Sequence, residues 1–185
     1  MIYIAKKAPE RRNLLKHFSR YLVLYAVFSV AGVFLLSATG YRGTSGSRFA
    51  TDVFPALWLD LLLLASLFVG TMTFFLPAVA GTCVVLRGAA CGVRLAYVSA
   101  SSDISITHTA ILWLTEILCG LLLCYACSFC RHASTYFFSK THKTGKKPFT
   151  PFISGSIISF TLVITILSFL FACVHICKML LWAHM

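Results

Sequence analysis

Long apolar runs constrain this chain more than any other feature. Residues 21–38 form one uninterrupted run, and further runs cover residues 54–86, 104–130 and 152–182. A helix that crosses a membrane needs about 17–25 predominantly apolar residues. Lipid offers no water to the backbone N–H and C=O groups, so a run buried there must satisfy them internally as a helix. The sequence therefore predicts an all-α fold, a polytopic transmembrane helix bundle surrounded by membrane lipid.

The composition excludes a water-soluble fold. Of the 185 residues, 59% are hydrophobic and only 11% are charged. A soluble domain carries roughly 25% charged residues, and so few charges could not cover its surface. The length suits a single transmembrane helical domain, which we place at residues 21–185, with no second folded domain.

The charges gather in two segments that flank apolar runs. The chain has 16 Lys and Arg against 5 Asp and Glu, a formal net charge of +11. Residues 1–20 and 131–151 hold many of these cations. Such clusters are typical of cytoplasmic flanks under the positive-inside rule, so residues 1–20 are interpreted as a basic cytoplasmic segment. No RNA- or DNA-binding motif accompanies the charge, and nucleic acid is not an expected partner.

The charge rule also sets the expected number of helices. If residues 1–20 and 131–151 both lie inside, an even number of crossings separates them. We therefore interpret Arg87 and Gly88 as a cytoplasmic turn. This turn separates a second helix, which is kinked near Pro77, from a short third helix. The alternative, a re-entrant third segment, breaks the charge rule. The five predicted spans are residues 21–38, 54–86, 89–103, 104–130 and 152–182, with the N-terminus inside and the C-terminus outside.

Ionisable residues inside the predicted spans are the candidate functional residues. Asp60, Arg94 and Glu116 each lie within an apolar run. A charge at the bilayer centre costs roughly 2.5–3.5 kcal/mol on insertion scales, so it usually faces the bundle and finds a partner. We expect Arg94 to pair with Glu116 or Asp60. A helix-locking pair is the favoured interpretation and an ion or substrate path the alternative. His108, two turns before Glu116, is either a proton-handling partner or, more simply, an interfacial histidine.

Small residues mark expected helix contacts. Gly88 and Gly92 form a small-xxx-small pattern, which lets two helix backbones approach closely. We assign Gly70, Gly81 and Pro77 to helix packing as well. Packing within the chain is favoured, although the same pattern also allows a homo-oligomer.

The remaining polar chemistry predicts neither a catalytic nor a metal site. The eight cysteines all lie in apolar segments and are read as small helix-packing residues. Cys124, Cys127 and Cys130 are spaced along one helix, which cannot wrap three thiolates around one ion. Nucleotide-binding loops, serine nucleophile elbows and HExxH zinc motifs do not occur in the sequence. No cofactor, metal or enzymatic activity is therefore expected.

One stretch resembles a known family. It runs from Leu57-Trp58-Leu59-Asp60 through Leu67-Phe68-Val69-Gly70 and Phe75-Leu76-Pro77 to Leu86-Arg87-Gly88 and Gly92. This pattern is similar to the central region of stage II sporulation protein M and its relatives, as are the basic N-terminal flank, the five predicted helices and the length. Glu116 matches an acidic residue of the next helix in that family. The usual His-Gly or Pro-Gln lead-in is missing, and Ile111-Leu112-Trp113 stands in its place.

The resemblance implies a function without catalysis. Its namesake is a scaffold of the bacterial cytoplasmic membrane that gathers cell-wall hydrolases during engulfment in sporulation. By this resemblance the chain is a scaffold that recruits other membrane or cell-wall proteins. The alternative is a transporter or permease subunit, in which Asp60, Arg94 and Glu116 line a pathway.

Overall fold

The computed structural model describes residues 8–38, 53–71, 73, 75–100, 106–144 and 151–183. Apart from Thr73 and Phe75, every one of these residues is helical, which confirms the predicted all-α bundle. The five helices are α2 (Ala8–Ala38), α3 (Val53–Thr71), α4 (Leu76–Ala100), α5 (Ile106–Thr144) and α6 (Pro151–Ala183).

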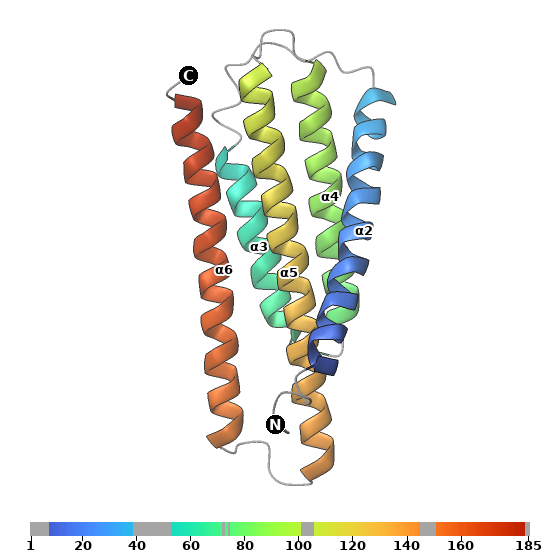
Figure 1. Cartoon of the computed structure of the whole chain (residues 1–185), viewed down its shortest axis with the longest axis vertical. Helices are drawn as coiled ribbons and strands as arrows, with labels where there is room; N and C mark the ends of the chain where they lie inside the picture. Colours follow the sequence, from blue (N-terminus) through green and yellow to red (C-terminus); the bar gives the residue numbers. More distant parts are fainter. Residues whose placement is uncertain are drawn as a thin grey trace.

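Successive helices run in opposite directions along the long axis (Figure 1). The shorter helix α3 packs against α4, α5 and α6, while α2 packs against α4 and α5. The beginning of α2 lies at the same end of the bundle as the end of α5 and the beginning of α6 (Figure 1). Both basic segments of the sequence therefore adjoin one end, and helix α6 finishes at the other.

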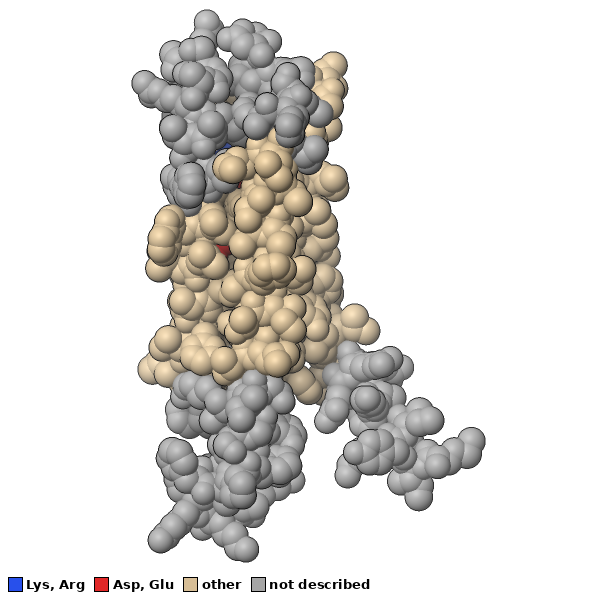
Figure 2. Space-filling model, turned by 90° about the vertical axis from the view of Figure 1, so that its left-hand side faces the viewer, with Lys and Arg blue, Asp and Glu red and all other residues tan. Residues whose placement is uncertain are grey.

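Large apolar side chains are exposed along the outer surface of the described helices. Phe34 of α2 and Trp58 of α3 expose 69% and 63% of their surface, and Phe75, just before α4, exposes 75%. On the face turned to the viewer in Figure 2, charged atoms show only as small spots between uncharged ones. Helices α2, α4, α5 and α6 contain apolar stretches long enough to cross a membrane, and the apolar part of α3, Ala56–Thr71, is shorter. These features define an integral membrane protein, as the composition predicts.

The division of the central region differs from the prediction. The break falls at residues 72–75, so residues 54–86 are not one kinked helix and residues 89–103 are not a separate short one. Pro77 is the second residue of α4, where its missing N–H and fixed φ suit a helix start. Thr73 donates its backbone N–H and its hydroxyl to the Gly70 carbonyl oxygen, at 3.0 and 2.9 Å, and so completes the end of α3. Arg87 lies in the middle of α4 rather than at a turn.

Two helices extend beyond their predicted spans, and one agrees closely. Helix α2 begins at Ala8, inside the segment expected to precede the first span, and α5 continues to Thr144, past the expected end at residue 130. The added residues include Lys, Arg and Glu, which are good helix formers, so the helices continue beyond their apolar parts. Helix α6 differs from its predicted span, residues 152–182, by one residue at each end.

Buried residues recur every three or four positions along helices α3 and α6. On α3 this stripe consists of Ala56, Asp60, Leu64, Leu67 and Thr71. On α6 it consists of Ile164, Leu167, Phe171, His175 and Lys178. A spacing of 3.6 residues per turn places the members of each stripe on one face. Ionisable side chains on these stripes are therefore directed into the bundle with the apolar core.

Candidate functional site

Asp60 on α3 lies between a cation from α4 and an imidazole from α6. Its Oδ1 atom is 2.6 Å from Nε of Arg87. Its Oδ2 atom is 2.8 Å from Nε2 of His175. The side chains of Asp60 and Arg87 are fully buried. Each carboxylate oxygen of Asp60 thus has a partner from a different helix.

Glu116 on α5 contacts three cations. Its Oε2 accepts a hydrogen bond from Nη1 of Arg87 at 2.6 Å. Its Oε1 accepts one from Nη1 of Arg94 at 3.1 Å and lies 3.6 Å from Nζ of Lys178. Arg94 is the most exposed member, with 22% of its side chain accessible. The expected pairing of Arg94 with Glu116 is present in the structure.

We call these six residues the ionic cluster, and they join four helices. Its members are Asp60 of α3, Arg87 and Arg94 of α4, Glu116 of α5, and His175 and Lys178 of α6. Helix α2 adds a contact through Tyr25, whose hydroxyl donates to the backbone carbonyl oxygen of Glu116 at 3.1 Å. In a low-dielectric interior an ion is stable only when it is paired and hydrogen-bonded. The cluster therefore ties the register of each helix to its neighbours.

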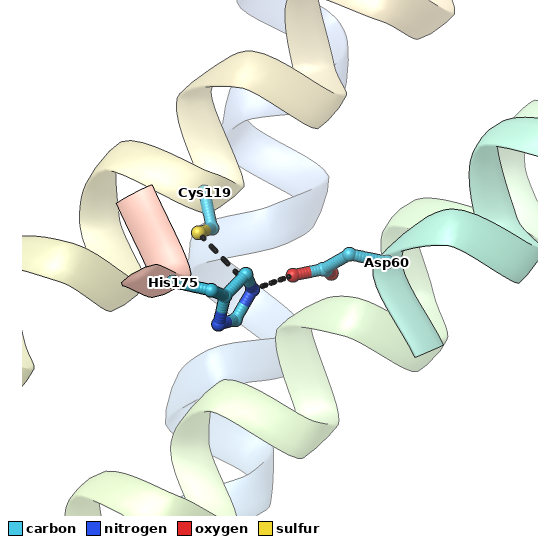
Figure 3. A group of neighbouring side chains, drawn as sticks. All are labelled: Asp60, Cys119 and His175. Carbon is cyan, nitrogen blue, oxygen red and sulfur yellow. Dashed lines mark hydrogen bonds and ion pairs between the residues drawn. The ribbon is translucent and has the colours of Figure 1, made fainter. Parts of the chain in front are cut away.

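His175 also approaches a thiol. Figure 3 shows its ring between Asp60 and Cys119 of α5. The Cys119 Sγ atom lies 3.9 Å from Nε2, the same ring nitrogen that contacts Asp60. A nucleophile–base relay needs the carboxylate on one ring nitrogen and the nucleophile on the other. The arrangement is therefore not that of a catalytic triad.

The same three residues offer metal-ligand atoms. One donor atom each from Asp60, Cys119 and His175 lies within 4.8 Å of the other two, and all three residues are buried. Metal binding would require a free lone pair on His175 Nε2, which would break its bond to Asp60. It would also add positive charge beside Arg87, which already lies 2.6 Å from the other Asp60 oxygen. A tetrahedral zinc site needs a fourth ligand as well. The geometry favours the ion-paired state over a divalent metal centre.

The glycines assigned to packing have different surroundings. A Cβ atom at Gly88 would lie 2.8 Å from the carbonyl oxygen of Tyr25, and one at Gly92 would collide with the carbonyl oxygen of Ser29. Both glycines thus line a close contact between α4 and α2 within the chain. A Cβ at Gly70 would meet the side chain of Val79 at 3.2 Å, whereas one at Gly81 would have no neighbour within 4 Å.

Sequence reasoning identified part of the cluster. Asp60, Arg94 and Glu116 were candidates because a charge in an apolar run stands out. Arg87 was assigned to a turn, since the Gly and Ala residues after it resemble a helix end. His175 and Lys178 lie near the end of the last run, where charges are common. The side chain of His108 lies outside the described residues.

The buried positions on α4 carried a signal for Arg87. Buried residues recur along this helix at the helical period, and Arg87 lies in register with Val84, Cys91 and Val98. An unbroken stripe across residues 84–98 indicates one continuous helix with Arg87 on its inner face.

Fold and site together define a class: a five-helix membrane protein with a buried ionic cluster at its centre. Comparisons with protein-family models, with curated protein sequences and with solved structures found no match.

Proposed function

We propose that this chain is a non-catalytic membrane scaffold that holds partner proteins at the membrane. The observation that carries the proposal is the pairing of both buried carboxylates. Asp60 and Glu116 together contact residues of α4 and α6, and every one of their four oxygens has a partner within 3.1 Å. Carboxylates that are paired in this way are suited to fixing helices in place.

A transport pathway has a different requirement. A carboxylate that carries an ion or proton must release one partner and take up another during each cycle. In this structure Arg87 bridges both carboxylates, so protonating either would leave a buried guanidinium partly unpaired. The cost of that step favours a static role for the pair.

The surface of the bundle supports docking in the membrane plane. Large apolar side chains such as Trp58 and Phe169 are exposed on the outer face. Helices associate in lipid through van der Waals contact and small residues. Following the resemblance to stage II sporulation protein M, the proposed partners are cell-wall hydrolases on the outer side of a bacterial cytoplasmic membrane. The common end of the two basic segments would then face the cytoplasm.

A transporter or permease subunit is the second candidate, and one observation favours it. Arg94 joins the cluster through Glu116 and is also partly accessible from outside. A basic side chain at the edge of a buried site is also found where a protein binds an anionic substrate. The partial exposure of Arg94 provides a side from which such a substrate could approach.

A charge-neutral double variant separates the two candidates. Asp60→Asn with Arg87→Met removes one negative and one positive charge, and replacing a buried pair by neutral groups of similar volume often preserves stability. The single variant Asp60→Asn is the matched control, because it leaves the cation in place. Each variant would replace the native chain in its host, and the tagged protein would be purified with its partners.

The scaffold proposal expects the double variant to retain the function of the native chain and to co-purify the same peptidoglycan-hydrolase activity. The single variant should lose both as its folded fraction falls. The double variant could instead be folded and monodisperse and keep its partners, and yet fail to support function. That result would favour a transport pathway through the cluster over a scaffold.

A further inference from the structure

Basic side chains of two helices meet at the end of the bundle where α2 begins. Helix α2 packs against α5, and its first turns lie beside the later part of α5 (Figure 1). The basic side chains close enough to His17 of α2 for their charges to act on it come from both helices. We call this group the basic patch, and its members are Lys16, His17 and Arg20 of α2 and Arg131 and His132 of α5.

The basic patch has no carboxylate of its own among the described side chains. The described carboxylates are Asp60 and Glu116, and both belong to the ionic cluster. In the sequence, Glu10 is the only acid before Asp52, and no acid follows Glu116. Glu10, whose side chain lies outside the described ones, would balance only one of the cations. Like charges that lie together repel one another, so an anion from outside the chain would stabilise this end of the bundle.

The patch lies at the boundary of the apolar surface on both helices. The apolar run of α2 begins at Tyr21, and that of α5 ends at Cys130. These two residues belong to one buried core, in which Tyr21 lies close to Cys130 and Arg131. The two runs therefore end at the same level, and the basic residues of each helix follow directly beyond it. Basic side chains next to a membrane span lie at the depth of the lipid headgroups.

The composition of the patch suits a phosphate group that is attached to an acyl chain. Arg20 and Arg131 provide one guanidinium from each helix, and a guanidinium binds phosphate through two parallel N–H···O hydrogen bonds. Leu15 and Val23 flank Arg20 along α2 and expose 62% and 64% of their surface, which offers an apolar contact to a lipid tail. A zwitterionic headgroup also brings an ammonium group, which the basic side chains would repel.

We propose that the basic patch binds the phosphate of an anionic phospholipid, with Arg20 of α2 and Arg131 of α5 as the principal donors. The bound lipid joins α2 to α5 at the membrane surface and offsets the repulsion between their cations. Phosphatidylglycerol, which has one phosphate and no amine, is the simplest lipid of this class. The inference is independent of the scaffold proposal, because the patch and the ionic cluster share no residue.

Native mass spectrometry of the full chain tests the proposal. The protein would be purified in a neutral detergent and titrated with phosphatidylglycerol or with phosphatidylcholine of the same acyl chains. We expect one phosphatidylglycerol to bind about tenfold more tightly than phosphatidylcholine, or better, since each basic side chain near the surface contributes about 1 kcal/mol. Soluble glycerol phosphate, which has the phosphate without the acyl chains, should not bind over the same concentrations.

A matched pair of double variants locates the lipid. Arg20→Gln with Arg131→Gln removes one guanidinium from each helix and should abolish the preference for phosphatidylglycerol. Lys146→Gln with Lys147→Gln removes the same number of charges from the sequence between α5 and α6, outside the described residues, and should keep the preference within about twofold, because these lysines do not belong to the patch. Arg20→Gln alone changes an exposed side chain. It should weaken the preference in part, and it serves if the first double variant does not fold.

Three outcomes would overturn the proposal. Equal affinities for the two phospholipids would show that the patch does not select an anionic headgroup. Equal losses in the two double variants would assign the effect to the net charge of this end of the chain. Glycerol phosphate that binds as tightly as phosphatidylglycerol would indicate a site for soluble anions in place of a lipid site.

Discussion

Arg87 links the two buried carboxylates of this protein through different nitrogens of one guanidinium. Its Nε atom lies 2.6 Å from Asp60 and its Nη1 atom 2.6 Å from Glu116. The planar guanidinium presents several donors in fixed directions, which a lysine ammonium on a flexible stem does not. A side chain of this kind can bridge α3 and α5 from its place on α4. At the scale of single residues, Arg87 thus connects the two halves of the cluster.

Glu116 should be the more sensitive of the two carboxylates. Its replacement by Gln removes the carboxylate that Arg87, Arg94 and Lys178 all contact. Removing one member of a buried ion pair typically costs about 3–5 kcal/mol, and we expect a loss in this range. Unfolding of the purified variant by SDS titration would measure it. Tyr25→Phe is the control, since it removes one hydrogen bond, worth about 0.5–1.5 kcal/mol; an equal loss in both variants would contradict the central role of Glu116.

Helix α4 serves two different contacts along its length. One face carries Arg87 and Arg94 toward Glu116, and another brings Gly88 and Gly92 against α2. The glycines let the two backbones approach until a Cβ atom at either position would press on a carbonyl oxygen of α2. The close α2–α4 contact therefore depends on the absence of side chains at two positions of one helix.

Gly92→Ala should disturb this contact and Gly81→Ala should not. The new Cβ at residue 92 would collide with the Ser29 carbonyl oxygen, while that at residue 81 would have no neighbour within 4 Å. Overpacking typically costs about 1–3 kcal/mol, whereas alanine in place of a free helical glycine is neutral or mildly stabilising. Thermal unfolding of the two variants side by side checks the prediction. Equal stabilities would show that α2 does not pack closely at Gly92.

The sequence predicted helices better than it predicted their ends. Apolar runs of membrane-crossing length identify α2, α5 and α6 because lipid leaves the backbone no alternative to a helix. The boundary between α3 and α4 was misplaced because Arg87 followed by Gly88 resembles a helix end when no partner is known. The burial of Arg87 is explained only by its contacts with Asp60 and Glu116, which lie on other helices. In the sequence, Pro77 fits either a kink within one helix or the start of a new helix. Only the interruption between α3 and α4 in the structure distinguishes the two.

At the scale of the whole molecule, polarity is arranged opposite to that of a soluble protein. The ionic cluster occupies the interior, and large aromatic and aliphatic side chains are exposed on the outside of the described helices. The alternating helix directions place both basic segments next to one end (Figure 1). The charge rule predicts that this end faces the cytoplasm.

Cysteine labelling tests that orientation. Ser45→Cys and Ser101→Cys should react with a membrane-impermeant maleimide in intact cells, and Thr144→Cys should react only after permeabilisation. The parent chain, with its eight native cysteines, is the control for background labelling. Reaction of Thr144→Cys in intact cells would reverse the proposed orientation.

A double-mutant cycle between Arg87 and Glu116 tests the central claim most directly, namely that these two side chains are bound to one another inside the bundle. The free energy of unfolding would be measured in detergent for the wild type, Arg87→Met, Glu116→Gln and the double variant. Contacting residues in one ionic network are coupled by about 0.5–3 kcal/mol, and we predict a coupling toward the upper part of that range, with the double variant more stable than the sum of the single losses implies. Losses that add within about 0.5 kcal/mol would contradict the account.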